Sequence, residues 1–550
     1  MTSAEQAEVV VIGGGHNGLT CAAYLAMAGR DVLVLEARDE AGGCASTVDA
    51  IGARVNICNC DHTMVLASGI IEELGLAAHG LRYLDIDPVQ IAVSWSDAPV
   101  FVQWRSVERT LDGLARSGGG GRAGNTGAAN ASAAYRRYLK EALPAAQLML
   151  AVQGSPASTG RMVTAAARRG LRGSATLLRW ARVSLLDVLS GFGFPPWLTA
   201  AAATSGPAVW GLPPDAPGTG LAALGFATRH LVGVGRPAGG SGALPAALAR
   251  CVAAHGGQIV TGARAAGVAV SDGRVRAVRL ADGRTVKADI VINATDPRAL
   301  LVDWLDGVPA AARLRAKWAA RADRDGYESK VDAVVTALPL PRAVADLDTG
   351  LLPAAARNVP TTVISPLPDE QIAAAAKARD GLVSDTPMFL LNTPSVRDSL
   401  MRPGPGRDLL SLEVLWTPYA LGGGWAASAE PWSWLERLAA LCEPGLLDCV
   451  QTWRAMTPPD YEREFGLVRG YAPSFPGGVV AALTGRQPEL SRYRTPVRGL
   501  YLTGAATFPG AGVWGASGRN AAAVVLATAR RQGRNKQGRN KQGRNKQGRN

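Results

Sequence analysis

Apolar residues near the start of the chain form two short runs on either side of a helix-like stretch. Residues 9–12 are Val-Val-Val-Ile, a β-branched run that suits a strand buried on both faces. Residues 19–28 are rich in alanine and leucine, which favour helix, and Gly29 stands where a helix stop is expected. Residues 32–35 are a second apolar run. The pattern predicts a strand, a helix and a second, parallel strand.

Three glycines occupy the turn between the first predicted strand and the helix. Gly13, Gly15 and Gly18 form a G-x-G-x-x-G pattern. The first glycine permits a tight turn, the second lets the backbone approach a pyrophosphate, and the third allows the helix to pack close to the strand. The N-terminus of the helix presents free N–H groups to phosphate oxygens. Glu36 ends the second strand, where a carboxylate can bind a ribose. The pattern predicts a dinucleotide site.

The middle of the chain predicts a helical region and a strand-rich region. Residues 135–225 are rich in Ala, Leu and Arg, and we expect the Trp and Phe side chains there to pack in a core, with an aromatic-lined pocket as the alternative. Residues 80–105 predict short strands. Short apolar runs from residue 258 onward are separated by two Asp-Gly turns, which is a hairpin pattern, and 289–293 predicts a further buried strand.

A second glycine-rich segment lies near the other end of the chain. Residues 499–503 predict a strand, and the glycine-rich loop that follows leads into an alanine-rich helix, so N–H groups and a helix dipole again point outward. In a flavoprotein, such a helix can face the electron-rich end of the isoalloxazine ring and stabilise the reduced flavin. Taken with the first glycine motif, this segment favours FAD over NAD as the dinucleotide.

The positive charge of the chain is concentrated at one end. Of a net charge of +13, nine basic residues and no acidic residue lie from Arg530 onward, so the remainder is nearly balanced and gives no reason to expect specific nucleic-acid binding. Residues 533–550 repeat G-R-N-K-Q without an apolar side chain, which predicts a disordered tail. The sequence has no apolar run long enough for a membrane span, and we expect no signal or transit peptide.

The cysteines and histidines are scattered. Their spacing forms neither C-x-x-C nor H-x-x-x-H, so we expect no metal site and reduced, buried thiols, as in the cytoplasm. Cys58 and Cys60 would share one face of a strand, but with Cys44 they do not form a redox motif. We expect Asp61 and His62 to be a hydrogen-bonded structural pair, with a role in lining a site as the alternative.

The motifs at both ends of the chain together resemble one family. The chain is similar to the FAD oxidoreductases related to phytoene dehydrogenase and carotenoid desaturases, and most similar to the branch called pyridine nucleotide-disulfide oxidoreductase domain-containing protein 2. The resemblance covers nearly all of residues 7–529. It is carried by V-I-G-G-G-H-N-G-L at 11–19, G-G-C-A-S-T at 42–47, G-G-S-G-A-L at 239–244, D-I-V-I-N-A-T-D-P at 289–297, T-P-S at 393–395 with Asp398, and the segment 499–521.

This resemblance implies non-covalent FAD in a Rossmann-like α/β domain, joined to an α+β substrate domain in an amine-oxidase-like, two-domain architecture. We expect the FAD-binding domain at 7–80, 236–300 and 488–530, the helical and substrate domain at 81–235 and 301–487, and a disordered basic tail at 531–550. The cofactor-binding residues expected from the glycine motifs and the resemblance are Gly13, Gly15, His16, Asn17, Gly18, Glu36, Ala37, Gly42, Gly43, Gly504, Val513 and Gly515.

The activity implied by the resemblance is that of an FAD-dependent dehydrogenase or desaturase, in which a small apolar organic substrate gives a hydride to flavin N5. Cys44 stands where carotene desaturases commonly have Arg, which argues against a carotenoid as that substrate. The alternatives are a flavin amine oxidase and a flavin-binding scaffold with little turnover. Asp61, His62 and Tyr327 are candidates for acid–base chemistry, but no catalytic residue is assigned.

Some properties stay open or are not expected. A disulfide reductase is not expected, because the chain lacks both a second G-x-G-x-x-G and C-x-x-x-x-C. The electron acceptor is left open between oxygen and a quinone, as is the oligomeric state. We expect a cytoplasmic protein and leave a peripheral membrane contact open.

Overall fold

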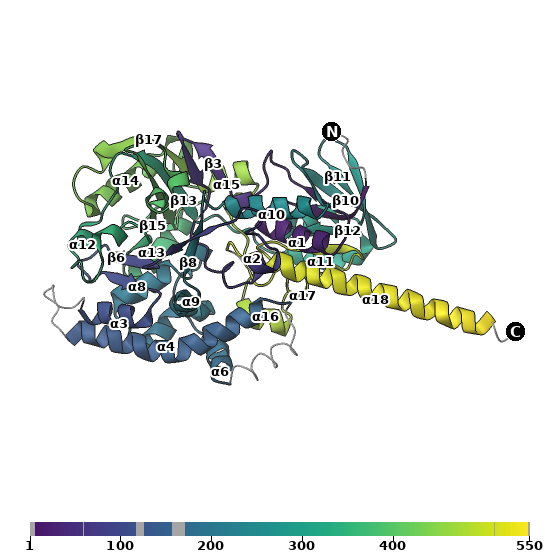
Figure 1. The fold of residues 1–550 in the computed structure, drawn as a ribbon, viewed down its shortest axis with the longest axis horizontal. Helices are drawn as coiled ribbons and strands as arrows, with labels where there is room; N and C mark the ends of the chain where they lie inside the picture. Colours follow the sequence, from purple (N-terminus) through teal and green to yellow (C-terminus); the bar gives the residue numbers. More distant parts are fainter. Residues whose placement is uncertain (1–5, 59, 117–125, 157–170, 511, 548–550) are drawn as a thin grey trace.

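Two seven-stranded sheets organise the chain. The structure is a computed structural model that describes residues 6–58, 60–116, 126–156, 171–510 and 512–547. The first sheet lies at the right of Figure 1 and the second at its upper left, with a group of helices below the second sheet. This arrangement is the Rossmann-like, two-domain α/β architecture that the sequence predicted, with the mixed second sheet forming the core of the other domain.

The predicted βαβ unit lies in the first sheet. The strand order is β10-β11-β12-β1-β2-β9, and β18 also pairs with β12. Strands β9, β2, β1, β12 and β18 run parallel to one another, whereas β11 is antiparallel to both β12 and β10. Residues 9–12 are fully buried, as expected for an apolar run covered on both faces. The strands are β1 Gln6–Ile12, β2 Val32–Leu35, β9 Gln258–Val260, β10 Ala265–Ser271, β11 Arg274–Leu280, β12 Thr285–Asn293 and β18 Leu500–Leu502.

Strand β12 is longer than the pattern at 289–293 predicted. It begins at Thr285 and is continuous to Asn293, because it is paired at both ends. Its first residues pair with β11, its last residues pair with β18, and β1 pairs with most of its length on the other edge. The partner strands come from distant parts of the chain, so the local pattern could not show that residues 285–288 continue into the run at 289–293 as a single strand.

Helices α1 (His16–Met27) and α18 (Ala516–Gln547) pack against each other with their backbones in contact. A Cβ atom built on Gly518 would lie 2.1 Å from the carbonyl oxygen of Asn17 and 2.8 Å from the amide nitrogen of Cys21. No side chain fits at this position, so glycine is required there. The contact brings the first helix of the chain alongside the last one, and α10 (Ala243–Ala254) also packs against α1.

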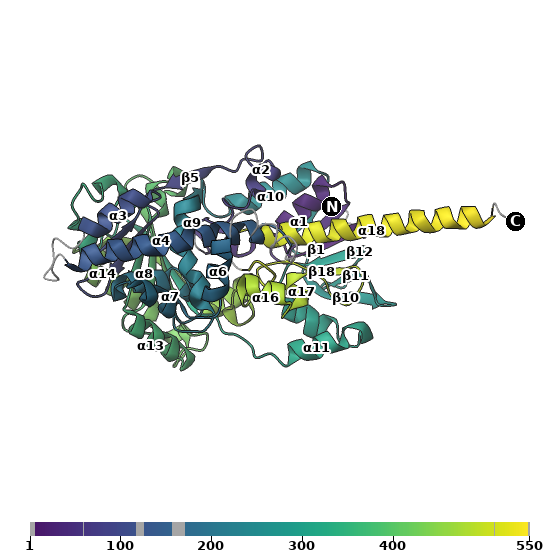
Figure 2. The same cartoon turned by 90° about the horizontal axis from the view of Figure 1, so that it is seen from below.

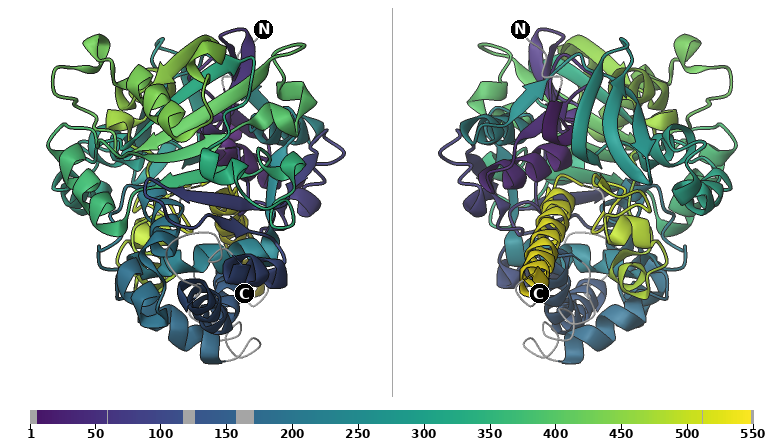
Figure 3. Two further views of the ribbon diagram at one scale, coloured as in Figure 1. Left: turned by 90° about the vertical axis from the view of Figure 1, so that its left-hand side faces the viewer. Right: turned by 90° about the vertical axis from the view of Figure 1, so that its right-hand side faces the viewer.

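The second sheet has the strand order β17-β13-β16-β15-β14-β6-β7. One face carries an apolar cluster that includes Val331, Leu412, Val414 and Phe389 and is covered by Trp434 of α14. The opposite face carries polar residues and lies against the first domain. The strands are β6 Gln90–Ser94, β7 Phe101–Gln103, β13 Glu328–Val335, β14 Thr361–Ser365, β15 Met388–Asn392, β16 Asp408–Leu415 and β17 Val450–Met456. Figure 3 shows this domain from its own side in the left panel, and the first sheet with α18 in the right panel.

The aromatic residues of the helical region pack in a core. Trp180 is buried and its ring is stacked on that of Tyr138, with the ring centroids 6.2 Å apart. Phe192 and Phe194 contact the same Tyr138 ring edge to face. The prediction of a core is therefore correct for these side chains, whereas Trp210 is exposed. The helices are α3 Val107–Arg116, α4 Thr126–Gln153, α6 Leu171–Trp180, α7 Leu185–Phe192, α8 Pro196–Thr204 and α9 Leu224–Val232.

Two short antiparallel pairs connect the domains. Strand β3 (Thr47–Ala50) pairs with β4 (Ala53–Asn56), and β5 (Tyr83–Ile86) pairs with β8 (Val234–Pro237). Strands β4 and β8 lead residues of the first domain towards the polar face of the second sheet. The remaining helices are α2 Ile70–Glu73, α11 Ala312–Ala319, α12 Arg342–Ala345, α13 Pro368–Arg379, α14 Glu430–Leu441, α15 Pro458–Phe465, α16 Gly478–Thr484 and α17 Pro488–Ser491.

Helix α18 differs from the disordered tail that the sequence predicted at 531–550. The backbone stays helical to Gln547 and projects away from both domains, as Figure 2 shows from below. Extending an existing helix avoids the cost of nucleation, and Arg, Lys and Gln of the repeat are good helix formers. Among the described residues, none of the helices combines the length and apolar character that a membrane crossing requires.

The contact of α1 with α18 leads to a first prediction. Gly518→Ala would place a methyl group against the backbone of α1, so we expect helix α18 to be displaced, with a loss of thermal stability and of bound cofactor. Gly191→Ala is the matched control, because Gly191 is an exposed helical glycine in α7 whose Cβ would meet nothing within 4 Å. That variant should be neutral or more stable by up to about 1 kcal/mol. Equal melting temperatures for the two variants would contradict the prediction.

Candidate functional site

The turn between β1 and α1 has the geometry that its glycines predicted. Gly13 has φ +99°, a left-handed conformation that favours glycine. A Cβ on Gly18 would lie 2.1 Å from the carbonyl oxygen of Gly13, so the helix packs directly on the turn. A Cβ on Gly15, in contrast, would meet nothing within 4 Å. Gly13 and Gly18 are therefore required by the protein's own packing, whereas Gly15 borders open space where a phosphate can approach the backbone.

The carboxylate of Glu36 is held at the end of β2 by backbone donors. The N–H of Gly14 donates to Glu36 Oε2 at 2.7 Å, and the N–H of Arg38 donates to Oε1 at 2.9 Å. The residue is buried, and Ala37 beside it is half-buried. Because each oxygen of an ionised carboxylate can accept more than one hydrogen bond, both retain capacity for a ribose hydroxyl.

A second glycine pair lies against the first glycine turn. The N–H of Gly42 donates to the carbonyl of Gly14 at 2.8 Å, and Gly42 forms a parallel bridge with Gly15. Gly42 and Gly43 have φ of +142° and +57°. A Cβ on Gly43 would lie 3.2 Å from Gly15 Cα. The structure therefore brings these two predicted segments together in one cradle.

The N-terminus of α1 is not capped by a side chain. Gly15 is the N-cap residue, and no side-chain hydrogen bond satisfies the first N–H groups of the helix. His16 and Asn17 follow, with Asn17 Nδ2 3.0 Å from His16 Nε2, and Asn17 Oδ1 is buried without a hydrogen-bond partner among the described residues. Burial lowers the pKa of His16 to about 4, although a hydrogen bond with the backbone of Gly512 opposes this shift. His16 is therefore neutral at pH 7.

The predicted C-terminal segment meets the first helix at this cradle. Gly504 has φ +100°, and a Cβ there would lie 2.9 Å from the carbonyl oxygen of Ala294, which follows β12. Gly515 has φ +84°, and a Cβ there would lie 2.9 Å from Thr20 Oγ1 of α1. Val513 between them is half-buried and packs on the main core. The two motifs, from opposite ends of the chain, thus line one region.

These residues fit a flavin dinucleotide. The uncapped helix N-terminus, the open space at Gly15 and the fixed carboxylate of Glu36 suit a pyrophosphate and a ribose. Buried polar atoms without partners among the described residues, Asn17 Oδ1 and Thr503 Oγ1, lie at the ends of these segments and are available to a ligand. The described residues contain no group of three or more His, Cys, Asp or Glu side chains that could hold a metal ion.

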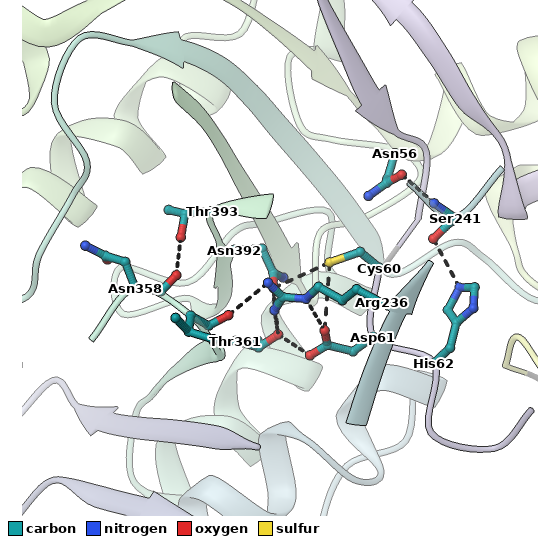
Figure 4. Close-up of polar contacts among 11 residues, drawn as sticks. Asn56, Cys60, Asp61, His62, Arg236, Ser241, Asn358, Thr361, Asn392 and Thr393 are labelled. Atoms are coloured by element: carbon teal, nitrogen blue, oxygen red, sulfur yellow. Dashed lines mark hydrogen bonds and ion pairs between the residues drawn. The ribbon is translucent and has the colours of Figure 1, made fainter. Parts of the chain in front are cut away.

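A buried polar network crosses from the first domain to the second sheet, as Figure 4 shows. Arg236 of β8 is 3% exposed and its Nε lies 2.6 Å from Asp61 Oδ1. Arg236 also donates to Asn392 Oδ1 at 2.8 Å. The Thr361 hydroxyl lies 2.6 Å from the same Asn392 oxygen and also within hydrogen-bond distance of Asp61, so it can donate its one proton to either. The network joins β8, β14 and β15 to the loop after β4. Cys60 Sγ lies 3.7 Å from Asn392 Oδ1.

The three residues considered for acid–base chemistry have structural partners. Asp61 pairs with Arg236, and His62 contacts the Tyr83 hydroxyl through Nδ1 at 2.9 Å and Ser241 Oγ through Nε2 at 3.1 Å. Burial lowers the pKa of His62 to about 3, so its imidazole is neutral. The hydroxyl of Tyr327 donates to the Val209 carbonyl at 2.9 Å. Asp61 and His62 do not form a pair with each other in the described contacts; each connects different elements.

All seven cysteines are free thiols. Cys44 and Cys58 lie close enough for a side-chain hydrogen bond, and this contact and burial raise the pKa of Cys58 well above its usual range. Burial also raises the pKa of Cys60 to about 12. Both thiols are protonated at neutral pH and are poor nucleophiles.

Sequence reasoning missed the charged residues of the second sheet. Lys330 and Asp332 alternate with valine and alanine in β13, and Glu413 interrupts the apolar run of β16, yet all three are buried. A charged residue every second position along an otherwise apolar strand was the available signal. It indicates a strand with one apolar face and one polar face.

Comparisons with known proteins agree with this geometry. The chain matches the NAD(P)-binding Rossmann-like domain family over residues 11–68 and the flavin containing amine oxidoreductase family over residues 196–322. Pyridine nucleotide-disulfide oxidoreductase domain-containing protein 2 of Mus musculus is 30% identical, covering 94% of this chain and 93% of that protein. A limonene dehydrogenase polypeptide of Castellaniella defragrans is 24% identical, covering 96% of this chain and 95% of that polypeptide.

One further relative and a solved structure extend these comparisons. Hydroxyneurosporene desaturase of Cereibacter sphaeroides is 30% identical over 56% of this chain and 59% of that protein. The crystal structure of cyclohexylamine oxidase from Brevibacterium oxydans superposes with a TM-score of 0.56 and 16% identity, covering 96% of this chain and 100% of that one. The last comparison shows the fold, and the family matches support FAD as the cofactor.

The open space at Gly15 gives a second prediction. Gly15→Val should fold, because a Cβ at this position meets no protein atom within 4 Å and the φ of −67° is accessible to valine, at a cost of about 1 kcal/mol for the weaker N-cap. The isopropyl group would occupy the space next to the helix N-terminus. We expect FAD affinity to fall at least tenfold, measured by titration of the apoprotein, with Gly191→Ala as the control. Wild-type affinity in Gly15→Val would show that the cofactor does not approach this position.

The buried pair of Arg236 and Asp61 gives a third prediction. Arg236→Met leaves the Asp61 carboxylate buried without its counter-ion, so we expect a loss of about 3–5 kcal/mol in the free energy of unfolding, measured by urea denaturation. The matched control is Arg105→Met, which removes an exposed partner of Asp85 and should cost less than about 1 kcal/mol. Adding Asp61→Asn to Arg236→Met should recover part of the loss. No difference between the two single variants would contradict the assignment.

Proposed function

This chain belongs to the family of FAD-dependent oxidoreductases that includes pyridine nucleotide-disulfide oxidoreductase domain-containing protein 2 and is related to the carotenoid desaturases, and from that premise we propose that it oxidises an organic substrate by removing a hydride from a substrate C–H bond. FAD, when bound, supplies N5 of the flavin as the hydride acceptor. The observation that supports this proposal most directly is the convergence of the two glycine-rich segments on the uncapped N-terminus of α1.

The cofactor side of the reaction is assigned to the first domain. We propose that the N–H groups at the start of α1 bind the pyrophosphate beside Gly15 and that the Glu36 carboxylate binds the adenosine ribose. Gly504, Val513 and Gly515 would line the flavin end, where the start of α18 stabilises negative charge. Neutral His16 adds no positive charge to this helix terminus.

The substrate side is assigned to the second sheet and the loop after β4. The network of Asp61, Arg236 and Asn392 fixes that loop against the sheet. Asp61, Arg236 and Asn392 position the loop, and we assign none of them as a proton donor or acceptor in the reaction. The names of the relatives limonene dehydrogenase and hydroxyneurosporene desaturase support an apolar body for the substrate.

Oxidation of an amine is the second candidate function. It is favoured by one observation, the buried carboxyl groups on the polar face of the second sheet, which suit a cationic substrate group better than a hydrocarbon. Electrons would leave the reduced protein to oxygen or a quinone, and we propose no other partner. A contact with a membrane surface would serve an acceptor dissolved in a bilayer.

Anaerobic spectroscopy tests the proposed function. The purified protein, with its bound FAD, is mixed anaerobically with a cyclic terpene, an alkylamine or an alcohol, and flavin absorbance is followed. A substrate should bleach the flavin, and deuterium at the reacting carbon should slow the bleaching. Photoreduced protein mixed with oxygen or a soluble quinone then identifies the acceptor. If no compound reduces the flavin and no acceptor reoxidises it, the enzymatic proposal is wrong and a flavin-binding scaffold is favoured. A protein purified without flavin would contradict FAD as the cofactor.

A further inference from the structure

The polar face of the second sheet presents a row of buried polar groups to the first domain. Lys330 pairs in register with Glu413, and Asp332 pairs with Ser411, so these four side chains share one face of strands β13 and β16. Asn392 of β15 continues the row beside Ser411. The end of β4 reaches this face, since Lys330 Nζ donates to the carbonyl oxygen of Asn56.

Most of the charges on this face have partners. Lys330 Nζ lies 2.6 Å from Asp332 Oδ1, and both side chains are 1% exposed. Arg454 of β17 approaches the other oxygen of Asp332 at 3.1 Å, and Ser411 Oγ donates to Asp332 Oδ1 at 2.9 Å. Asp332 is therefore fully satisfied by two cations and a hydroxyl, and these groups hold β13, β16 and β17 in register.

Glu413 and Glu328 have no such partners. Glu413 is only 4% exposed, yet its carboxyl makes no hydrogen bond or ion pair with any residue that the structure describes, and the same holds for the half-buried Glu328. Glu328 pairs in register with Leu415, which places it diagonally across from Glu413 on the same face. Such diagonal positions are roughly 7–8 Å apart, within reach of two glutamate side chains.

Polar and aromatic side chains from other elements surround the two carboxyl groups. Both carboxyl groups interact electrostatically with Cys58, Tyr327 and Tyr461. The ring of Trp416 packs against Tyr327, with centroids 6.3 Å apart, and its indole Nε1 is buried without a hydrogen-bond partner among the described residues. Trp416 thus leaves a buried donor without a partner next to Tyr327, whose hydroxyl the two carboxyl groups influence electrostatically. A ligand bound in this region would give the donor a partner.

We propose that Glu328 and Glu413 form the polar subsite of the substrate site and bind a protonated amino group on the substrate. This inference rests on the proposed flavin oxidoreductase function and favours its second candidate, the oxidation of an amine. The unpartnered carboxyl groups supply the counter-charge, and the rings of Tyr327 and Tyr461 suit a cation, because aromatic faces attract positive charge. An apolar remainder of the substrate would be accommodated elsewhere.

The charges on this face support a monocation at a pH where both carboxyl groups are ionised. In that state Glu328, Glu413 and Asp332 carry three negative charges against two positive charges on Lys330 and Arg454. Asp61 and Arg236 nearby cancel each other. One positive charge from the substrate restores neutrality, which matters because an uncompensated charge in a buried site is expensive.

The same pair can take the proton that an amine must lose before it is oxidised. An N–H bond of the substrate ammonium breaks, an O–H bond forms on one glutamate, and the substrate becomes a neutral amine, with no change in the number of electrons. Burial raises the pKa of Glu328 to about 7, and burial together with Glu328 raises the pKa of Glu413 well above its usual range. A raised carboxyl pKa makes proton acceptance favourable near neutral pH.

The pH dependence of binding follows from the groups that face the pair. Below about pH 7 Glu328 is protonated and lacks the charge to bind an ammonium ion, so affinity should rise as the pH increases through this range. The raised pKa of Glu413 acts in the same direction. Lys330 opposes the shift by favouring the ionised forms. The other titratable or charged groups facing the pair are Cys58, Cys60, Asp61, Tyr327, Asp332, Arg454 and Tyr461.

Ligand titrations of the FAD-bound protein test the inference. Hexylamine, which is cationic at neutral pH, should perturb the absorption spectrum of the oxidised flavin, and hexanol should bind at least tenfold more weakly. Glu413→Gln and Glu328→Gln should each weaken hexylamine binding at least tenfold and flatten its pH dependence, with hexanol binding and FAD content unchanged. Glu436→Gln is the control, because Glu436 is exposed on α14 over the opposite face of the same sheet. If Glu413→Gln fails to retain FAD, the test is made on Glu328→Gln, for which we expect the same loss of hexylamine binding and the same flatter pH dependence.

Two results would overturn the inference. The first is hexylamine binding that is unaffected by both substitutions, and the second is hexanol binding as tightly as hexylamine to the wild-type protein. Neither result bears on the proposed function, which is judged separately by anaerobic bleaching of the flavin with all classes of compound. If a terpene reduces the flavin and hexylamine does not bind, the proposed oxidoreductase function stands and the proposed amine subsite is wrong.

Discussion

The direct contact between the backbones of α1 and α18 is the constraint on which the cofactor site depends. Gly518 permits it, because any side chain there would collide with the carbonyl oxygen of Asn17. At this contact, the glycine turn of β1 and the loop after β18 lie side by side, and Gly515 packs on Thr20. Neither segment forms a complete site alone. In the proposed function one segment would line the phosphates and the other the flavin, so both would depend on the close packing of the two helices.

The second sheet has two faces with opposite chemistry. Its apolar face packs under α14 and gives the domain its core, whereas its polar face holds Lys330, Asp332 and Glu413 against the first domain. Charged groups on a buried face are retained at a cost in stability, because each must be desolvated. The ion pairs of Asp332 and Asp61 offset part of this desolvation free energy. The pair of Asp61 with Arg236 also fixes the loop after β4 against the sheet.

The cofactor half of the molecule could be predicted from the sequence because its signals are local. Gly13, Gly15 and Gly18 act within a few residues of one another, and Glu36 ends the next strand. The substrate half could not, because its chemistry arises from pairing between distant strands: Lys330 and Glu413 are neighbours only through the β13–β16 register. Asp61 and Arg236 likewise meet across the domains. The helical tail was mispredicted because composition alone does not show that α18 can extend into it.

The order of the strands in the first sheet has a consequence for synthesis on the ribosome. Strand β1 is made first, its neighbour β12 follows in the middle of the chain, and the closing elements β18 and α18 come some two hundred residues after β12. At typical translation rates, roughly 25–100 s separate α1 from α18. During that interval the nascent chain exposes the apolar surface of α1 that α18 later covers. The two segments of the proposed flavin site can therefore come together only after α18 has been made.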